Sequence, residues 1–263
     1  MKKALFCHCA YTDMLSGEMK QEILSALATA KIELVEITDL CELAAAKDTT
    51  LLEHFSSGDV TVIACHPRAV RWLLHSAGVD RSAAVDILDM RTDDVTSILK
   101  SFDSPSPSDT PHPFSISTRD WVPWFPVIDY SRCSNCRQCL NFCLFGVYET
   151  DEDGQVIVAN PSNCKNNCPA CARICPEIAI MFPKLNEEPL NGTEIVDETT
   201  ERAKVKLNLD EILGNDAYAA LAKRRRKRQK MVLMKRNRKK AEEERNACSS
   251  CDVNCEQNPN RQS

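Results

Sequence analysis

Glycine is scarce in this chain, and the common nucleotide-binding loops are missing. The 263 residues include seven glycines. They form neither the G-x-G-x-x-G pattern of a dinucleotide-binding turn nor a phosphate-binding loop. No Ser, His and Asp constellation stands out for nucleophilic catalysis. The sequence therefore carries no dinucleotide-binding or phosphate-binding motif, and we expect no catalytic triad.

Long apolar runs are also missing. No stretch approaches the roughly 20 residues that a membrane-spanning helix needs. The chain begins with a charged segment, but the apolar run that follows is short and is interrupted by His8, so we expect no signal peptide. Both absences favour a soluble, cytoplasmic protein, in which cysteines stay reduced.

Acidic residues are absent from one segment near the end of the chain. Residues 223–240 contain twelve Lys or Arg and no Asp or Glu, whereas the remainder has 21 basic and 38 acidic residues, a net charge of −17. With no proline or glycine to interrupt it, we expect a basic helix over 216–246. Such a helix could bind nucleic acid through counterion release. We favour a solvated helix that docks on an acidic partner or on the acidic remainder of this protein, because no recognised nucleic-acid-binding fold accompanies it.

Cysteine, in contrast, is abundant, and its spacing is the strongest signal in the sequence. Eight of the fifteen cysteines form two runs, Cys133-x2-Cys136-x2-Cys139-x3-Cys143 and Cys164-x3-Cys168-x2-Cys171-x3-Cys175, the second followed by Pro176. Two-residue gaps let three thiolates converge on one iron–sulfur cubane. Disulfides are disfavoured in a reducing compartment, and structural zinc uses two cysteine pairs instead of two interleaved quartets. The spacing therefore favours two 4Fe-4S clusters.

With these two runs, the chain resembles the bacterial two-cluster ferredoxin domain, an α+β fold. The resemblance implies that the fourth cysteine of each run crosses to the other cluster. The implied ligands of cluster 1 are Cys133, Cys136, Cys139 and Cys175, and those of cluster 2 are Cys164, Cys168, Cys171 and Cys143. Leu144 stands where proline often follows the first run, and the second run opens with a gap of three residues instead of two.

Residues 1–100 alternate strand and helix patterns, which predicts an α/β domain with a small parallel sheet. The expected strands are 4–9, 32–37, 60–65 and 85–90, and the expected helices are 18–30, 41–47, 50–56, 68–77 and 93–100. Because parallel strands end at one edge of a sheet, cysteines near strand ends are expected to meet there. These cysteines are Cys7, Cys9, Cys41 and Cys65.

Two interpretations of these four cysteines remain open from spacing alone. Cys41 and Cys65 are either ordinary buried residues, as free cysteines often are, or ligands of a metal site. The pattern Cys7-His8-Cys9, then Cys41, then Cys65-His66-Pro67 resembles the N-terminal domain of heterodisulfide reductase A subunits. That resemblance implies a third 4Fe-4S cluster on the four cysteines, and we expect His8 and His66 to be hydrogen-bonding or surface residues.

The remaining segments complete the expected organisation. A Pro- and Ser-rich linker over 101–120 precedes the ferredoxin-like domain at 121–184. A polar connection follows at 185–215, then the basic helix, then a flexible tail at 247–263. The tail contributes three cysteines without a fourth ligand, which we regard as an accessory metal site or an oxidisable tail: Cys248, Cys251 and Cys255.

These features predict an electron carrier or a redox subunit more than a stand-alone enzyme. The expected partners are redox proteins, including a flavin-containing or heterodisulfide-reductase-like oxidoreductase, because the flavin-binding part of that reductase is missing here. The alternative is an interaction or nucleic-acid-binding protein whose clusters are structural or sensory.

Overall fold

The computed structural model describes residues 3–30, 32–55, 60–81, 83, 85–102, 116 and 118–213. The chain divides into two compact units, Met1–Leu209 and Asp210–Ser263. Nearly all described residues belong to the first unit. The basic helix expected at 216–246 and the cysteines of the 247–263 tail lie outside the described residues. None of the described helices is long and apolar enough to cross a membrane.

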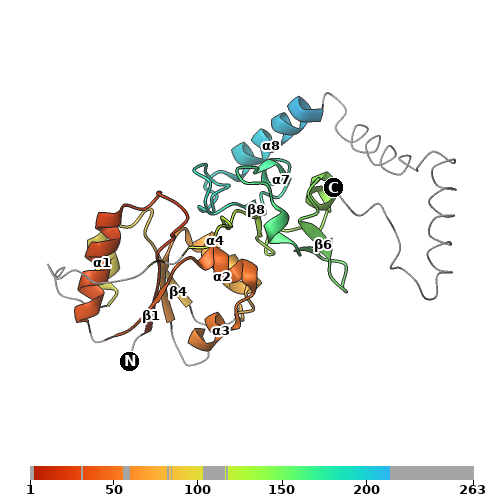
Figure 1. Cartoon of the computed structure of the whole chain (residues 1–263). Helices are drawn as coiled ribbons and strands as arrows, with labels where there is room; N and C mark the ends of the chain where they lie inside the picture. Colours follow the sequence, from red (N-terminus) through yellow and green to blue (C-terminus); the bar gives the residue numbers. More distant parts are fainter. Residues whose placement is uncertain are drawn as a thin grey trace, which may run out of the picture. The chain divides into compact units, whose positions relative to one another are not determined.

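A four-stranded parallel sheet forms the centre of the N-terminal domain, so the prediction of an α/β fold is confirmed (Figure 1). Its strands are β1 Lys3–Cys7, β2 Glu33–Ile37, β3 Val60–Ala64 and β4 Val85–Asp89, in the order β2-β1-β3-β4. The helices are α1 Gly17–Thr29, α2 Leu40–Ala46, α3 Thr49–Phe55, α4 Pro67–Ser76 and α5 Val95–Lys100. Helices α1 and α5 pack together, as do α2 and α4, and the two pairs cover opposite faces of the sheet.

The inner strands are apolar on both faces because helices cover both sides of the sheet. Leu5 and Phe6 of β1 and Val62 and Ile63 of β3 are fully buried. In register, Leu5 pairs with both Val35 of β2 and Val62 of β3. The apolar strand patterns in the sequence thus correspond to the buried centre of the domain.

The strand order creates a switch point between β1 and β3. The chain leaves β1 through α1 toward β2 on one side, and it leaves β3 through α4 toward β4 on the other side. In open parallel sheets, binding sites form at the carboxyl ends of the strands where the connections diverge in this way. The cysteines that follow β1 and β3 are therefore located at the most favourable position for a site.

The second cysteine-rich region has short antiparallel strands around small helices. Strand β5 Val127–Ile128 pairs with β8 Ile180–Met181, and β6 Tyr148–Thr150 pairs with β7 Val156–Val158. Between them lie α6 Gln138–Phe142, the 3-10 helix η1 Pro161–Asn163 and α7 Ala170–Arg173. Trp124 stacks on Phe182 with ring centroids 5.3 Å apart, so this aromatic residue before β5 packs against the domain.

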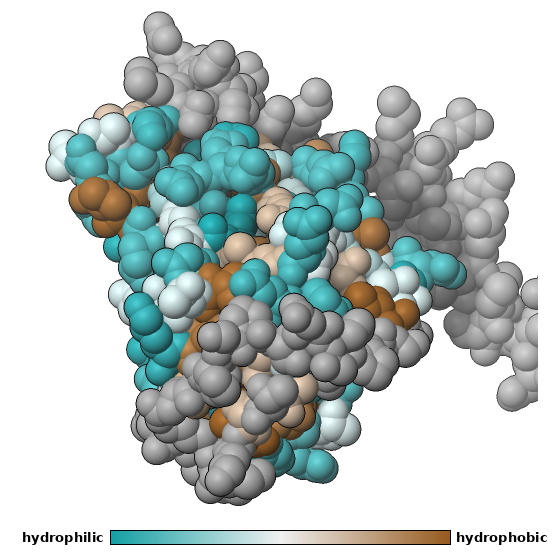
Figure 2. Space-filling model, turned by 90° about the vertical axis from the view of Figure 1, so that its left-hand side faces the viewer, coloured by the Kyte–Doolittle hydropathy of each residue, from teal (hydrophilic) through white to brown (hydrophobic). Residues whose placement is uncertain are grey.

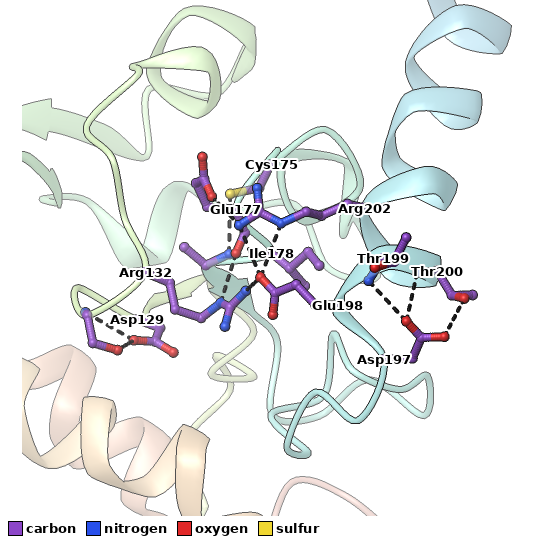
Figure 3. A network of polar contacts seen from close by, with 12 residues as sticks. Asp129, Arg132, Cys175, Glu177, Ile178, Asp197, Glu198, Thr199, Thr200 and Arg202 are labelled. Atoms are coloured by element: carbon purple, nitrogen blue, oxygen red, sulfur yellow. Dashed lines mark hydrogen bonds and ion pairs between the residues drawn. The ribbon is translucent and has the colours of Figure 1, made fainter.

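The segment after this domain differs from the polar, unstructured connection that the sequence predicted. Leu190 and Asn191 are buried, and the Phe182 backbone N–H donates to the Leu190 carbonyl at 2.7 Å. Helix α8 spans Glu198–Leu213, within the segment expected at 185–215 as a polar connection. Asp197 starts it by accepting hydrogen bonds from two backbone N–H groups of the first turn (Figure 3). The sequence did not indicate this helix, because its apolar residues do not recur at helical spacing.

The surface of the described part is mostly polar where Figure 2 shows it. Hydrophilic side chains cover much of that face, and apolar side chains form small separate groups. Scattered apolar side chains are normal on a protein surface.

Candidate metal centres

Asp129 organises the turn that leads into the first cysteine run. Its carboxylate accepts a hydrogen bond from the Ser131 backbone N–H at 3.1 Å. Its backbone carbonyl accepts from the N–H groups of Arg132 at 3.1 Å and Cys133 at 3.0 Å. These bonds set the direction of the Cys133 side chain.

Left-handed residues shape the loop between Cys133 and Cys139. Asn135 and Arg137 have φ angles of 55° and 61°, and alternating right- and left-handed residues direct successive N–H groups toward one side of a loop. The Asn135 side chain holds the loop against the β6–β7 hairpin, donating to the Gly154 carbonyl at 2.9 Å and accepting from the Val156 N–H at 3.0 Å. Such a concave loop suits an anionic cluster.

Cys175 of the second run joins the three cysteines of the first. Cys133, Cys136, Cys139 and Cys175 line one small cavity, together with apolar side chains of the strands and of the loop before β8. Burial, together with the charges of the neighbouring Cys175, Cys133 and Cys136, raises the pKa of the Cys139 thiol to about 12. The structure thus brings together the four residues that the sequence assigned to cluster 1.

Cys143 of the first run lies beside the second run. Burial, together with the charges of Cys168 and Cys143, raises the pKa of Cys164 to about 12. Burial also raises the pKa of Cys171, with Cys164, Cys139 and Cys143 as its charged neighbours. The three-residue gap after Cys164 includes Asn167 with a φ of 60°. The gap that is one residue longer than usual thus contains a residue in the left-handed conformation.

The chemistry of the donor set fits iron–sulfur clusters. All twelve described cysteines are free thiols. Within the described part of the chain, no group of three or more Cys, His, Asp or Glu side chains is arranged to hold a single metal ion. A mononuclear zinc site needs its four ligand atoms to converge on one centre, whereas the thiolates of a cubane each bind a different iron. The residues present in the two quartets therefore fit 4Fe-4S clusters as ligands.

Comparison with known proteins identifies this region. An uncharacterized ferredoxin of Methanocaldococcus jannaschii is 49% identical over 63 residues, which are 24% of this chain and 42% of that protein. Ferredoxin-3 of Nostoc sp. is 35% identical over 75 residues, covering 22% of this chain and 76% of that protein. By this domain the chain belongs to the ferredoxins.

One further relative and the extent of the matches complete the comparison. Pyruvate synthase subunit PorD of Methanocaldococcus jannaschii is 34% identical over 71 residues, covering 27% of this chain and 78% of that protein. No family model matches the chain. The chain spans less than half the length of the first of these relatives, and these matches cover about a quarter of this chain.

Tyr148 is a residue of the ferredoxin domain that the sequence did not single out. Its side chain is buried, and burial raises the pKa of its phenol, as do Cys171 and Cys139. Tyr148 therefore lies near cysteines of both quartets. No spacing rule identifies a tyrosine in this role, because a tyrosine in a strand is usually a packing residue.

A polar network holds the loop after Cys175 against helix α8 (Figure 3). Arg132 donates to the Glu177 carbonyl at 2.9 Å and pairs with Glu198. Arg202 pairs with Glu177 at 2.7 Å and with Glu198 at 3.0 Å. Hydrogen bonds from Arg132 and Arg202 lower the pKa of the Glu198 carboxyl. The network restrains the segment that carries the crossing cysteine.

The four cysteines of the N-terminal domain are buried together at the carboxyl end of its sheet. Cys7 ends β1, Cys9 follows it with a φ of 46°, Cys41 lies in the first turn of α2, and Cys65 follows β3. None is more than 9% exposed. The sulfurs of Cys7 and Cys9 are 3.5 Å apart, and the Leu40 N–H donates to Cys7 Sγ at 3.2 Å.

Electrostatics show that Cys41 and Cys65 belong to the same group. Burial raises the pKa of Cys41 to about 12, and the charge of Cys7 raises it as well. Burial also raises the pKa of Cys65, with Cys41 and Cys7 as its next contributors. Cys41 and Cys65 are therefore close enough to Cys7 for their charges to interact, and all four cysteines are buried near the carboxyl ends of the strands.

The two histidines of this domain make hydrogen bonds to carboxylates. His8 Nε2 is 2.9 Å from Glu36 Oε2, and His66 Nδ1 is 2.7 Å from Asp89 Oδ2. Both histidines are buried, so they are hydrogen-bonding residues but not surface residues. Each carboxylate partner orients an imidazole beside a cysteine of the group.

Proposed function

We propose that this chain is an iron–sulfur electron-transfer protein with two 4Fe-4S clusters in its ferredoxin domain and a third in its N-terminal domain. The observation that supports the proposal is that Cys175 lines one cavity with the three cysteines of the first run, while Cys143 is a charged neighbour of Cys164 in the second run. This is the crossed arrangement expected of a two-cluster ferredoxin.

The proposed ligands are the three quartets already described. Each bound cluster would accept and return one electron at a time. The protein residues would hold the clusters, exclude water and offset their negative charge through backbone N–H groups. The Ala179 N–H, which donates to Cys175 Sγ at 3.3 Å, is one such group.

The third cluster is supported by the N-terminal cysteine group. Four buried thiols from separate segments would repel one another once ionised, unless a cationic centre binds them. The similarity to the N-terminal domain of heterodisulfide reductase A subunits favours iron–sulfur over zinc at this position. It also supports a role as a redox subunit over that of a stand-alone enzyme.

Redox proteins are the proposed partners. One relative is a subunit of pyruvate synthase by name, which supports an association with an oxidoreductase, including a flavin-containing or heterodisulfide-reductase-like one. Cys136 is exposed at the surface of the ferredoxin domain, so electrons could pass to a partner there. Nucleic acid is not favoured as a partner, because the basic segment at 223–240 is the one feature of the sequence that favours nucleic-acid binding.

Iron and acid-labile sulfide, measured after purification without oxygen, test the proposal. We expect about twelve of each per chain for three four-iron clusters. Replacing Cys41 and Cys65 together with serine should remove about four of each, while Cys251→Ser, in the C-terminal tail, should remove none. About eight of each in the unaltered chain, unchanged in the Cys41 and Cys65 variant, would rule out the third cluster.

A further inference from the structure

Lys184 brings a positive charge from the ferredoxin domain to the cysteine group of the N-terminal domain. It lies three residues after the end of β8, yet its Nζ atom donates to both carboxylate oxygens of Asp39, at 3.0 Å and 2.8 Å. The Lys184 side chain is 7% exposed and that of Asp39 is 1% exposed. The charge pair is therefore almost completely removed from water.

Asp39 ties this pair directly to the segment that bears Cys41. Its carboxylate caps helix α2 by accepting a hydrogen bond from the Glu42 N–H at 3.1 Å. Cys41 lies in the turn that this cap begins, and the next residue after the cap, Leu40, donates its N–H to Cys7. Lys184 thus reaches the point where two of the four cysteines are held.

The position of Lys184 is restrained on both sides by Arg91, which follows β4. Arg91 donates from Nη1 to the Pro183 carbonyl at 3.3 Å and from Nη2 to Asn186 Oδ1 at 3.3 Å. The ring of Tyr11 lies 6.0 Å from Lys184 Nζ. These contacts come from the N-terminal domain, so they hold the lysine at the cysteine group.

Electrostatic interactions support direct proximity between Lys184 and the cysteines. Burial alone would lower the pKa of Lys184, but Cys41, Asp39 and Cys9 together raise it above its usual value. Conversely, Lys184 lowers the pKa of Cys41 against the larger effect of burial. The buried ion pair with Asp39 holds the ammonium group of Lys184 beside the segment that carries Cys41.

We propose that Lys184 holds a fixed positive charge at the four-cysteine site and raises the reduction potential of the cluster bound there. This inference rests on the third cluster proposed above. A 4Fe-4S cluster gains one negative charge when it takes one electron from a reductant such as dithionite. A buried cation beside it stabilises that reduced state, because the low local dielectric leaves the attraction weakly screened. Asp39 is negatively charged, so it should lower the reduction potential of the cluster.

The opposite signs of the two charges distinguish an electrostatic role from a structural one. Lys184→Met should lower the equilibrium constant for reduction of this cluster by about tenfold or more, a shift of about 59 mV per tenfold for one electron. Asp39→Asn retains a good helix cap and should shift the constant upward. The double variant removes both charges and should lie close to the unaltered chain.

Lys3→Met is a matched control in the same domain. Lys3 begins β1 and pairs with Glu33 at 3.0 Å, whereas Cys7 ends that strand. Four residues of a strand span about 13 Å, and a Coulomb interaction weakens with distance. The same change of charge should therefore shift the potential much less than Lys184→Met does.

A redox titration of the full chain, followed by electron paramagnetic resonance, provides the measurement. The wave of the N-terminal cluster is the one that disappears when Cys41 and Cys65 are replaced with serine. If no wave and no iron are lost in that variant, the third cluster is absent and this inference fails with it. If the wave exists but Lys184→Met and Asp39→Asn move it in the same direction, or not at all, Lys184 is only a structural contact.

Lys184→Met alone leaves Asp39 buried and unpaired, and this variant could lose iron for that reason. The double variant of Lys184→Met and Asp39→Asn has no unpaired charge and should retain iron. Asp39→Asn alone then still reports the direction in which the reduction potential shifts. The proposal is supported if the reduction potential rises in Asp39→Asn and returns to that of the unaltered chain in the double variant. A potential that stays raised in the double variant would overturn it.

Discussion

Replacing Arg68 with methionine should strongly destabilise the contact between the N-terminal and ferredoxin domains. Arg68 lies in α4, and its Nε atom donates to Asp129 Oδ2 at 2.8 Å. Its Nη2 atom donates to the Ile178 carbonyl. The side chains of Arg68 and Asp129 are only 5% and 4% exposed, so methionine would leave a carboxylate buried without its cation.

Removing one partner of a buried ion pair typically costs about 3–5 kcal/mol of unfolding free energy. Arg71, in the same helix, offers a matched control, because its 4.0 Å contact with Glu194 joins side chains that are 65% and 71% exposed. An exposed pair of this kind contributes about 0–1 kcal/mol. Arg71→Met should therefore have little effect, and Asp129→Asn should recover part of the loss in an Arg68→Met background.

Unfolding rates in guanidinium, measured without oxygen by the loss of cluster absorbance, provide the assay. Rates are preferable to an equilibrium, because cluster release makes unfolding irreversible. If the pair breaks before the rate-limiting step, about 3 kcal/mol corresponds to unfolding more than about a hundredfold faster. Iron per chain before denaturant is added serves as the check on loading. Equal rates for Arg68→Met and Arg71→Met would refute the reasoning, because burial would then have no effect.

Three further predictions follow from the ferredoxin domain and the basic segment. Cys143→Ser should damage the cluster held by the second run and Cys175→Ser the one held by the first, as seen by electron paramagnetic resonance; the reverse result would contradict the crossed assignment. Gly192→Ala should speed unfolding, since its φ is +102° and a Cβ would lie 2.4 Å from a side chain of α4; the cost is about 1–3 kcal/mol. Gly146→Ala, with a φ of +70° but open space around it, should cost less, and an equal cost would exclude the clash. Deleting 223–240 should abolish a salt-dependent association with an acidic partner at constant iron; undiminished binding at low salt would contradict a docking role.

Much of the fold was predictable because local patterns encode it. The strands and helices of the first hundred residues differ from the expected ranges by only a few residues at their ends, since buried strands and amphipathic helices each have their own apolar pattern. The cysteine spacing indicated the ferredoxin domain, because short gaps constrain which thiolates can share a cluster; the exchange of Cys143 and Cys175 stays a prediction. Parallel strand ends likewise predicted that Cys7, Cys9, Cys41 and Cys65 would lie close together.

The contacts between the domains were decided only by the tertiary structure. Lys184 lies 145 residues from Asp39 in sequence, and Arg68 lies 61 residues from Asp129. A lysine or arginine in a sequence normally indicates an exposed side chain, and nothing near Lys184 or Arg68 distinguishes it from the surface residues. Their burial depends on where two separately folded segments meet. That is a property of long-range packing, which carries no periodic signal in the chain.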